Sequence, residues 1–213
     1  LHESNAIPGK VSRFLGAYCD HVALGIPSSS NYLPRCKTSF TGTPVRSEFF
    51  LEQPLPSWVP SGEGILIVIM GGSQGAKKMN EMVRNILPWL LDKGCRVVHL
   101  TGKNDRFYRD LGKVETHPNL VVRHFSKEIP ALLQNADLAI SRAGAGAISE
   151  LMVTKTPSIL IPFPQSADHH QELNAAYMAR FGGAVIVNQH DPEEYILKRM
   201  VANLLDSNSL REM

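Results

Sequence analysis

Apolar and polar positions repeat with two different periods along the chain from about residue 65 onward. Short runs of β-branched and apolar residues, such as ILIVIM and SILIPF, are typical of parallel strands that helices cover on both faces. These runs predict strands at 65–70, 96–101, 120–125, 138–141, 158–163 and 184–187. Stretches with helical period predict helices near 75–92, 104–111, 129–135, 147–153, 169–181 and 192–205. The alternation predicts an α/β fold with a doubly wound parallel sheet of about six strands.

A segment rich in proline, glycine and serine, PLPSWVPSGEG at 54–64, separates this regular part from the beginning of the chain. Such a composition without periodicity is typical of a linker or an exposed domain junction. Upstream, SRFLGAYCDHVALGIP indicates one helix and one strand, which are too little to fold alone. We therefore expect residues 1–57 to be the end of a preceding domain with an interdomain segment, and residues 58–213 to form a second domain. The first residues, LHESN, lack an initiator methionine, which favours a piece of a longer protein.

Composition excludes several classes of protein. The 213 residues are 43% hydrophobic and carry a formal net charge of +2, so no global charge argues for nucleic acid as a partner. The three cysteines, Cys19, Cys36 and Cys95, have no CxxC spacing. This argues against a disulfide framework and a zinc site, suits a reducing cytoplasm, and leads us to expect buried free thiols. No apolar run approaches the roughly 20 residues that span a bilayer.

The loop after the first predicted strand of the regular part, in MGGSQGAKKMN, is rich in glycine. Its glycines would let backbone N–H groups and the Ser73 hydroxyl approach a diphosphate at the N-terminus of the next helix. Its spacing is neither the GxGxxG of dinucleotide sites nor the GxxxxGK[ST] of phosphate-binding loops. Tight backbone packing explains such a turn equally well, so this loop alone leaves both interpretations open.

A second loop of small residues, SRAGAGAISE at 141–150, opens a helix and places Glu150 in its second turn. A carboxylate at this position can accept hydrogen bonds from the two hydroxyls of a ribose. A surface acid near a helix N-terminus, where negative charge is favourable, is the simpler interpretation of Glu150 taken alone.

Polar side chains crowd the next helix start, in PFPQSADHHQELNA. Gln171 and Asn174 share one helical face and offer amide groups suited to the hydroxyls of a sugar. Asp168, His169 and His170 suggest a metal site, but adjacent histidines on a helix point about 100° apart, so we expect no metal.

A fourth loop, FSKEIP at 125–130, leaves backbone groups available to the edge of a flat base. One glycine-rich loop, one candidate ribose acid and one amide-rich helix start share one edge of the predicted sheet. Together they predict a nucleotide-sugar site.

Five segments of the chain also match one protein family in order and spacing: HESNAIPGKVSRFL, FTGTPVR, MGGSQGAKKMN, ADLAISRAGAGAISEL and PSILIPFPQSADHHQELNA. Over essentially its whole length the chain resembles the MurG family, the bacterial N-acetylglucosaminyltransferases of peptidoglycan synthesis. The resemblance implies a GT-B fold of two Rossmann-like domains, of which this chain would hold the C-terminal donor domain and the tail of the N-terminal one. It implies an inverting transfer of N-acetylglucosamine from UDP-N-acetylglucosamine to lipid I, undecaprenyl-pyrophosphoryl-N-acetylmuramoyl-pentapeptide, giving lipid II without a cofactor.

The resemblance also assigns donor contacts. They fall on Asn5, Arg46, Ser73, Ser126, Ala145, Gly146, Ala147, Ile148, Ser149, Glu150 and Gln171. Arg46 and Ser73 would stabilise the diphosphate leaving group, Glu150 would hold the ribose and Gln171 the sugar. The catalytic residues are expected on the absent part of the N-terminal domain, with His2 as the nearest candidate base here, so the chain alone is expected to be inactive. Ser4 and Thr43 depart from the family's HEQN and GNPVR patterns without removing a residue that has an assigned role.

The resemblance further implies a peripheral protein on the cytoplasmic face of the bacterial plasma membrane, with roles in cell-wall biogenesis, cell shape and cell division. Two other functions remain open. One is a nucleotide-sugar-binding subunit of a split glycosyltransferase. The other is a UDP-sugar epimerase of similar architecture, for which Asp168 and Glu172 are the candidate acids. A Rossmann oxidoreductase ranks last because the GxGxxG turn is absent.

Overall fold

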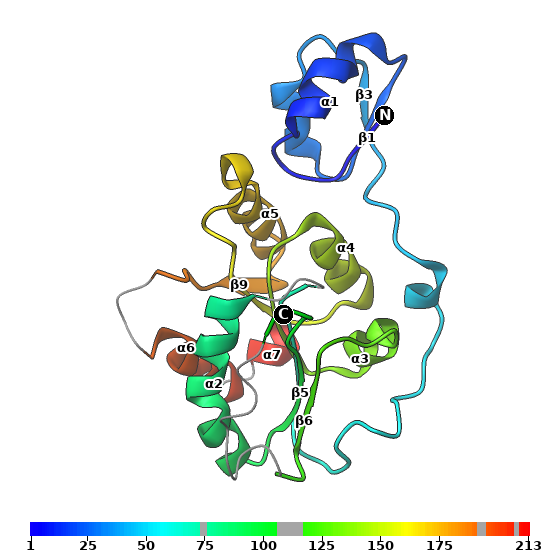
Figure 1. Ribbon diagram of the computed structural model, residues 1–213. Coiled ribbons are helices and arrows are strands. Elements are labelled where there is room, and N and C mark those ends of the chain that lie inside the picture. Colours follow the sequence, from blue (N-terminus) through cyan, green and yellow to red (C-terminus); the bar gives the residue numbers. More distant parts are fainter. Residues whose placement is uncertain (73–75, 106–116, 191–194, 207–208) are drawn as a thin grey trace.

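The computed structural model describes residues 1–72, 76–105, 117–190, 195–206 and 209–213, and it contains two parallel sheets (Figure 1). The smaller sheet has the order β1-β2-β3, with β1 at His2–Glu3, β2 at Val22–Leu24 and β3 at Thr38–Phe40. Helix α1 (Lys10–Leu15) and the 3₁₀ helices η1 (Gly16–Tyr18) and η2 (Pro27–Tyr32) connect these strands. The expected helix and strand are present, but β1 and β3 were not expected. They are only two and three residues long, so no period can be read from them.

The larger sheet has six parallel strands in the order β6-β5-β4-β7-β8-β9. The strands are β4 (Leu66–Met70), β5 (Arg96–Leu100), β6 (Leu120–Arg123), β7 (Leu138–Ser141), β8 (Ser158–Leu160) and β9 (Ala184–Ile186). All six expected strands are confirmed, although β6 and β8 end earlier than their apolar runs. The expected α/β fold with parallel strands is confirmed as well.

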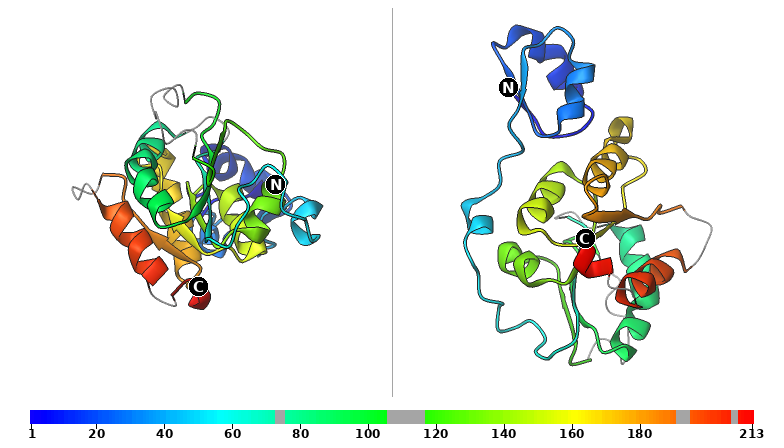
Figure 2. Two further views of the ribbon diagram at one scale, coloured as in Figure 1. Left: turned by 90° about the horizontal axis from the view of Figure 1, so that it is seen from below. Right: turned by 180° about the vertical axis from the view of Figure 1, so that it is seen from behind.

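Helices cover both faces of this sheet, as Figure 1 and the view from behind in Figure 2 (right) show. They are α2 (Lys77–Asp92), α3 (Ile129–Asn135), α4 (Ala145–Thr154), α5 (His170–Ala179) and α6 (Ile196–Asp206), followed by α7 (Ser209–Glu212). The 3₁₀ helix η6 (Ala167–His169) leads into α5, and η3 (Ser47–Phe50) lies between the two sheets in sequence. The expected helix at 104–111 falls mainly on residues outside the described ones, as does the expected start of the last helix at 192.

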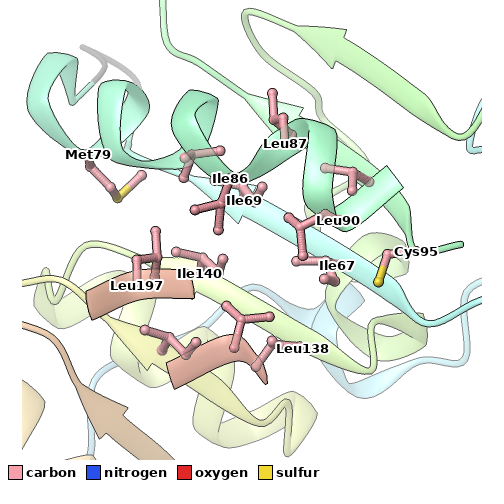
Figure 3. Packing of buried hydrophobic residues seen from close by; sticks show 14 of the residues in the cluster. Ile67, Ile69, Met79, Ile86, Leu87, Leu90, Cys95, Leu138, Ile140 and Leu197 are labelled. Atoms are coloured by element: carbon pink, nitrogen blue, oxygen red, sulfur yellow. The ribbon is translucent and has the colours of Figure 1, made fainter. Parts of the chain in front are cut away.

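Strand β4 is wholly buried and sends alternate side chains into two cores. Ile67 and Ile69 enter the core beneath α2 and α6 (Figure 3). Leu66, Val68 and Met70 enter the core that α3, α4 and α5 cover. Because apolar layers lie on both faces, the strand reads as a continuous apolar run in the sequence.

Helix α2 supplies a row of buried side chains to the core that contains Ile67 and Ile69. Met79, Val83, Ile86, Leu87 and Leu90 recur at the spacing of three and four residues that places side chains on one side of a helix. Figure 3 shows this row of side chains above β4 and β7. The packing fixes the start of α2 against the end of β4, at the edge where the strands end.

Part of the segment that was expected to be a linker or an exposed domain junction is packed against the larger sheet. Val59 and Pro60 are buried, and the Trp58 indole N–H donates to Glu128 at 2.7 Å. The Arg123 guanidinium lies 3.7 Å from the centre of the Trp58 ring, within the range of a cation–π contact. The prolines give no helical or strand period, but the aromatic and apolar residues between them provide buried surface. The division of the chain between residues 57 and 58 stays a prediction.

Candidate functional site

A cavity of about 800 Å³ opens at the carboxyl ends of the strands of the larger sheet. From β4 the chain builds the sheet in one direction through β5 and β6, and from β7 it builds in the other through β8 and β9. Such a switch point is where doubly wound sheets bind their ligands. The cavity walls comprise Met70, Gly71, Gly72, Ala76, Lys77, Lys78, Glu81, Leu100, His124, Phe125, Ile129, Ser141, Arg142, Gly144, Gly146, Ala147, Glu150, Phe163, Gln165, Gln171 and Gln189.

The glycines after β4 serve backbone geometry. A Cβ atom on Gly71 would lie 2.6 Å from the Cβ of Ala76, which is too close, and Gly72 has a φ of +87°. Only glycine adopts such a conformation without strain. The packing interpretation therefore holds for these two residues, while Ser73 lies outside the described residues and its phosphate contact stays a prediction.

The glycines at the start of α4 have a different role. Gly144 is the N-cap of α4 and Gly146 is in its first turn, and a Cβ atom on either would meet nothing within 4 Å. Both residues line the cavity. Because neither is required by packing, their small size keeps space open at a helix N-terminus, where unpaired N–H groups and the helix dipole favour an anion.

Of the expected contact residues at the start of α4, some line the cavity and others do not. Gly146 and Ala147 line the cavity, whereas Ala145 and Ile148 are buried and do not line it. The Ser149 hydroxyl donates to the backbone oxygen of Ala145 at 2.9 Å, within its own helix.

Glu150 lines the cavity from the second turn of α4 and is half-buried. Burial raises the pKa of its carboxyl group, and the positive charge of Arg46 acts on it in the opposite direction. Arg46 is the exposed N-cap of η3, and its guanidinium lies 5.3 Å from the centre of the Phe49 ring. The structure therefore brings Arg46 and Glu150 near each other, although Arg46 is not part of the cavity wall described above.

Gln171 reaches the cavity from the first turn of α5. Its Oε1 accepts the backbone N–H of Phe163 at 2.9 Å, which fixes the orientation of the amide. Among the described residues its Nε2 has no hydrogen-bond partner. A fixed amide with two N–H groups available can donate to a sugar hydroxyl or carbonyl.

Asn174 corrects the sequence-based expectation of an amide that faces a sugar. It is fully buried, and its Oδ1 accepts the backbone N–H of Ala6 at 2.8 Å. Its Nδ2 donates to Asn5 Oδ1 and to the backbone oxygen of Ala143, each at 3.1 Å. All of its polar atoms are therefore engaged in joining the N-terminal part to α5 and to the loop before α4. Asn5 takes part in this junction and is not among the residues that line the cavity.

Ser126 is also occupied by local structure. It is 5% exposed, and its hydroxyl oxygen accepts the backbone N–H of Glu128 at 3.0 Å. Its neighbour Phe125 is 55% exposed and lines the cavity together with Ile129. An exposed aromatic residue two positions after the end of β6 offers a surface for a flat base, and sequence reasoning missed it.

A buried polar network beside the cavity was also missed. His99 is fully buried, and its Nε2 lies 3.1 Å from Asn80 Oδ1. Asn80 Nδ2 donates to the backbone oxygen of Thr101 at 3.0 Å and to the Asp105 carboxylate. The Thr101 hydroxyl is 3.1 Å from His124 Nδ1, in the cavity wall. The network thus connects α2 and β5 with the wall after β6.

Burial lowers the pKa of His99 to about 3, although the charge of Asp105 opposes this shift and that of Arg84 adds to it. The imidazole is therefore neutral at physiological pH. Asn80 and His99 both lie among apolar core residues. In the sequence each therefore stands only as a single polar residue within an otherwise apolar pattern.

The Asp-His-His segment makes polar contacts at the surface. Asp168 lies 3.0 Å from the guanidinium of Arg13, and His169 Nδ1 lies 3.0 Å from Glu172. Within the described part of the chain, no three His, Cys, Asp or Glu side chains gather as a metal site would require. None of the described helices is long and apolar enough to cross a membrane.

The cysteine expectation is only partly correct. Cys95 is buried, whereas Cys19 and Cys36 are partly exposed, and all three are free thiols.

Fold and cavity together define an α/β domain with a candidate ligand site at the switch point of its sheet, and comparison with known proteins identifies the class. The family model "Glycosyltransferase family 28 C-terminal domain" matches residues 66–213. The chain belongs to this family.

Among its relatives is the UDP-N-acetylglucosamine--N-acetylmuramyl-(pentapeptide) pyrophosphoryl-undecaprenol N-acetylglucosamine transferase of Prochlorococcus marinus (strain NATL2A). It is 80% identical over 213 residues, which are 100% of this chain and 60% of the relative. The protein of the same name from Synechococcus sp. (strain CC9605) is 60% identical over 205 residues, or 96% of this chain and 56% of that protein. The chain therefore spans about 60% of the length of the curated relatives it matches.

Solved structures agree with this family. MurG from Acinetobacter baumannii superimposes with a TM-score of 0.74 at 25% identity, covering 100% of this chain and 60% of that chain. The calicheamicin glycosyltransferase CalG4 gives 0.63 at 17% identity, covering 95% and 51%. A putative UDP-N-acetylglucosamine 2-epimerase from Listeria monocytogenes gives 0.64 at 12% identity, covering 92% and 53%. The structures of CalG4 and of the Listeria protein show the fold alone. The expected GT-B type of fold and the resemblance to MurG are confirmed.

Proposed function

We propose that this chain binds the UDP-N-acetylglucosamine donor of an inverting hexosyltransferase that converts lipid I into lipid II in peptidoglycan biosynthesis. The observation that carries the proposal is the cavity at the switch point, where a helix N-terminus, the Glu150 carboxylate and the Gln171 amide meet. It occurs in a chain 80% identical to a transferase whose name specifies this reaction.

The cavity suggests a division of roles. The N-terminus of α4, with Gly144 and Gly146, suits the diphosphate, and Glu150 suits the ribose hydroxyls. Gln171 suits the sugar, and Phe125 offers an apolar surface to the uracil. Arg46 is close enough to act electrostatically on Glu150 and would stabilise the diphosphate leaving group, whose charge grows in the transition state.

We further propose that the whole protein acts at the cytoplasmic face of the plasma membrane as a peripheral protein. The relatives' name includes pyrophosphoryl-undecaprenol, a lipid-linked acceptor, and a soluble nucleotide sugar must meet this lipid at a membrane surface. Roles in cell-wall biogenesis, cell shape and cell division follow from the same proposal.

Of the two other functions, the epimerase is disfavoured by the position of its candidate acids. Asp168 forms an ion pair with Arg13, Glu172 Oε1 lies 3.0 Å from His169 Nδ1, and neither acid is among the described residues that line the cavity. A subunit of a split glycosyltransferase would contain the same donor cavity, so it would differ only in the chain that supplies the acceptor site.

Calorimetric titration of this chain with UDP-N-acetylglucosamine, UDP-glucose and UDP, without acceptor, tests the proposal. We expect binding of all three, with the N-acetylglucosamine donor preferred over UDP-glucose. A folded sample, checked by circular dichroism, that binds none of them would contradict the donor assignment.

Glu150→Ala is expected to weaken UDP binding by about tenfold, or about 1.4 kcal/mol. The substitution removes the acceptor of two ribose hydrogen bonds while leaving the helix start intact. The affinities of UDP and of its 2′,3′-dideoxy analogue, measured for both proteins, provide the test. The wild-type protein should prefer UDP and the variant should not. An unchanged preference would contradict the ribose assignment. Glu81→Ala removes another carboxylate from the same cavity wall and is the matched control, which should keep the preference for UDP.

Gly146→Ala should raise thermal stability yet weaken donor binding. Alanine in the helix reduces the conformational freedom of the unfolded chain, which stabilises by about 0.5–1 kcal/mol. The new methyl group would occupy cavity space, because nothing else lies within 4 Å of it. Melting temperature and calorimetric affinity should therefore change in opposite senses, and a stabilised variant with unchanged affinity would show that the ligand does not approach α4 here.

A further inference from the structure

Arg142 lies directly after β7, in the wall of the cavity, and is 8% exposed. Its Nη1 donates to the backbone oxygens of Ile161 and Pro162 at 2.9 and 3.1 Å, and its Nη2 donates to Gln189 Oε1. The side chain thus ties the end of β7 to the segments that follow β8 and β9. Neither the family resemblance nor the sequence pattern gave it a role.

The charge of Arg142 has no carboxylate counterpart among the described residues. Its three hydrogen-bond acceptors are neutral, and its guanidinium lies 5.6 Å from the centre of the Phe163 ring. A buried cation is costly unless an anion or several hydrogen bonds compensate it. Burial indeed lowers the pKa of Arg142 to about 10.

Two of the five guanidinium N–H groups have no acceptor among the described residues. The three hydrogen bonds use both protons of Nη1 and one proton of Nη2, which leaves Nε–H and the second Nη2 proton. These groups belong to a fixed side chain in a cavity wall, only two residues before the N-cap Gly144. Arg142 and the N-terminus of α4 therefore both line this cavity and both favour an anion there.

We propose that Arg142 is a donor-binding residue whose guanidinium meets the diphosphate of the bound nucleotide from the side of β7. This inference rests on the proposed function, because it presupposes that a nucleotide diphosphate occupies the cavity. The diphosphate would supply the missing negative charge and accept the two remaining N–H groups, and charge-assisted bonds of this kind are stronger than neutral ones.

A purely structural role is the alternative. In that case Arg142 would only hold the chain after β8 and β9 through Pro162 and Gln189, and its loss would disturb every part of the site equally. The two roles differ in their dependence on the phosphate groups of the ligand.

The affinities of UDP and of uridine, measured by calorimetry or NMR titration of the 213-residue chain, separate the two roles. Arg142→Gln should weaken UDP binding at least tenfold and uridine binding less than threefold, and Arg142→Lys should retain part of the preference for UDP. Arg180→Gln removes the same charge from an exposed position outside the cavity wall and should change neither affinity. A ratio of UDP to uridine affinity that is the same in Arg142→Gln as in the wild type would overturn the proposal.

A measurement on the wild-type protein covers the case in which Arg142→Gln does not fold. The Nε–H resonance of Arg142, assigned by its absence in Arg142→Lys, should move on addition of UDP and stay in place with uridine. A resonance whose chemical shift does not change at saturating UDP would contradict the diphosphate contact. If the folded wild-type chain binds neither UDP nor uridine, the proposed function fails and this inference with it, whereas binding without dependence on Arg142 overturns the inference alone.

Discussion

Asn174→Ala is expected to lower the free energy of unfolding by about 3 kcal/mol, more than any other substitution discussed. The side chain is fully buried and makes three hydrogen bonds, to Ala6, Asn5 and Ala143. Ala6 and Ala143 are themselves buried, so the truncation leaves a backbone N–H and a backbone oxygen without partners and away from water. Each such group costs about 1–3 kcal/mol.

Urea unfolding followed by circular dichroism measures this effect. Leu173→Ala, at the neighbouring and 41% exposed position of α5, is the matched control and should cost well under 1 kcal/mol. Asn5→Ala should cost less than Asn174→Ala, since it removes only one of the three bonds. A loss for Asn174→Ala no larger than that of the control would mean that the junction between the N-terminal part and α5 does not contribute to stability.

Stability is expected to fall by about 2 kcal/mol between pH 7 and pH 5 because of His99. Its pKa is about 3 in the folded state, because burial disfavours the imidazolium, and about 6.5 in an unfolded chain. Below pH 6.5 the unfolded state therefore binds a proton that the folded state does not. The contribution is fully present above pH 6.5 and decreases toward pH 3 by about 1.4 kcal/mol per pH unit.

Urea unfolding of the wild type and of His99→Gln at pH 5, 6 and 7 provides the test. Glutamine can keep a polar contact with Asn80 but does not titrate, so the dependence on pH should largely disappear in the variant. Two carboxyl groups with shifted pKa values also contribute to the dependence of stability on pH. Burial raises the pKa of Glu3, but hydrogen bonds from Ser12, Asn5 and Gly9 outweigh it and lower the pKa below 4.5. The raised pKa of Glu150 acts in the opposite sense to His99. Equal slopes in the two proteins would show that His99 is not the titrating group.

Sequence pattern recovered the larger sheet because each strand is an apolar run between helical segments. Leu66, Val68 and Met70 point to one core, and Ile67 and Ile69 to the other, so the chemistry of the run reflects its burial. The smaller sheet was not recovered, since β1 and β3 pair with β2 through only two or three residues each. Strands that short are held by backbone pairing across distant segments and carry no period of their own.

The candidate site was recovered where a residue's role depends on its local position in a loop. Gly146, Glu150 and Gln171 lie in the first two turns of the helices that follow β7 and β8, and all three line the cavity. Asn174 has the same chemistry and a similar position, but its partners come from residues far away in sequence. Whether an amide faces a ligand or a distant backbone group depends on the tertiary fold, which local spacing does not encode.

The buried network of Asn80 and His99 was beyond sequence reasoning for a related reason. Asn80 lies on the apolar face of α2 beside Met79 and Val83, where periodicity predicts an apolar residue. Its partners, Thr101 and Asp105, both lie in the loop after β5. A polar residue at such a position marks a satisfied contact in the core, but the contact itself follows only from the pairing of α2 with the sheet.

The position of the cavity at the strand-order reversal ties ligand binding to cooperative unfolding. One wall follows β4 and the opposite wall follows β7, strands that pair through Ile69 and Ile140, so neither half of the sheet contains a complete site. A ligand held across this line has affinity only for the state in which both halves are joined. At a concentration of 100 times its Kd it would add about 2.7 kcal/mol to the free energy of global unfolding. The ligand would also suppress partial opening at an edge of the sheet, at β6 or at β9, when that opening disrupts the cavity wall. Edge opening that leaves the cavity wall intact would not be affected.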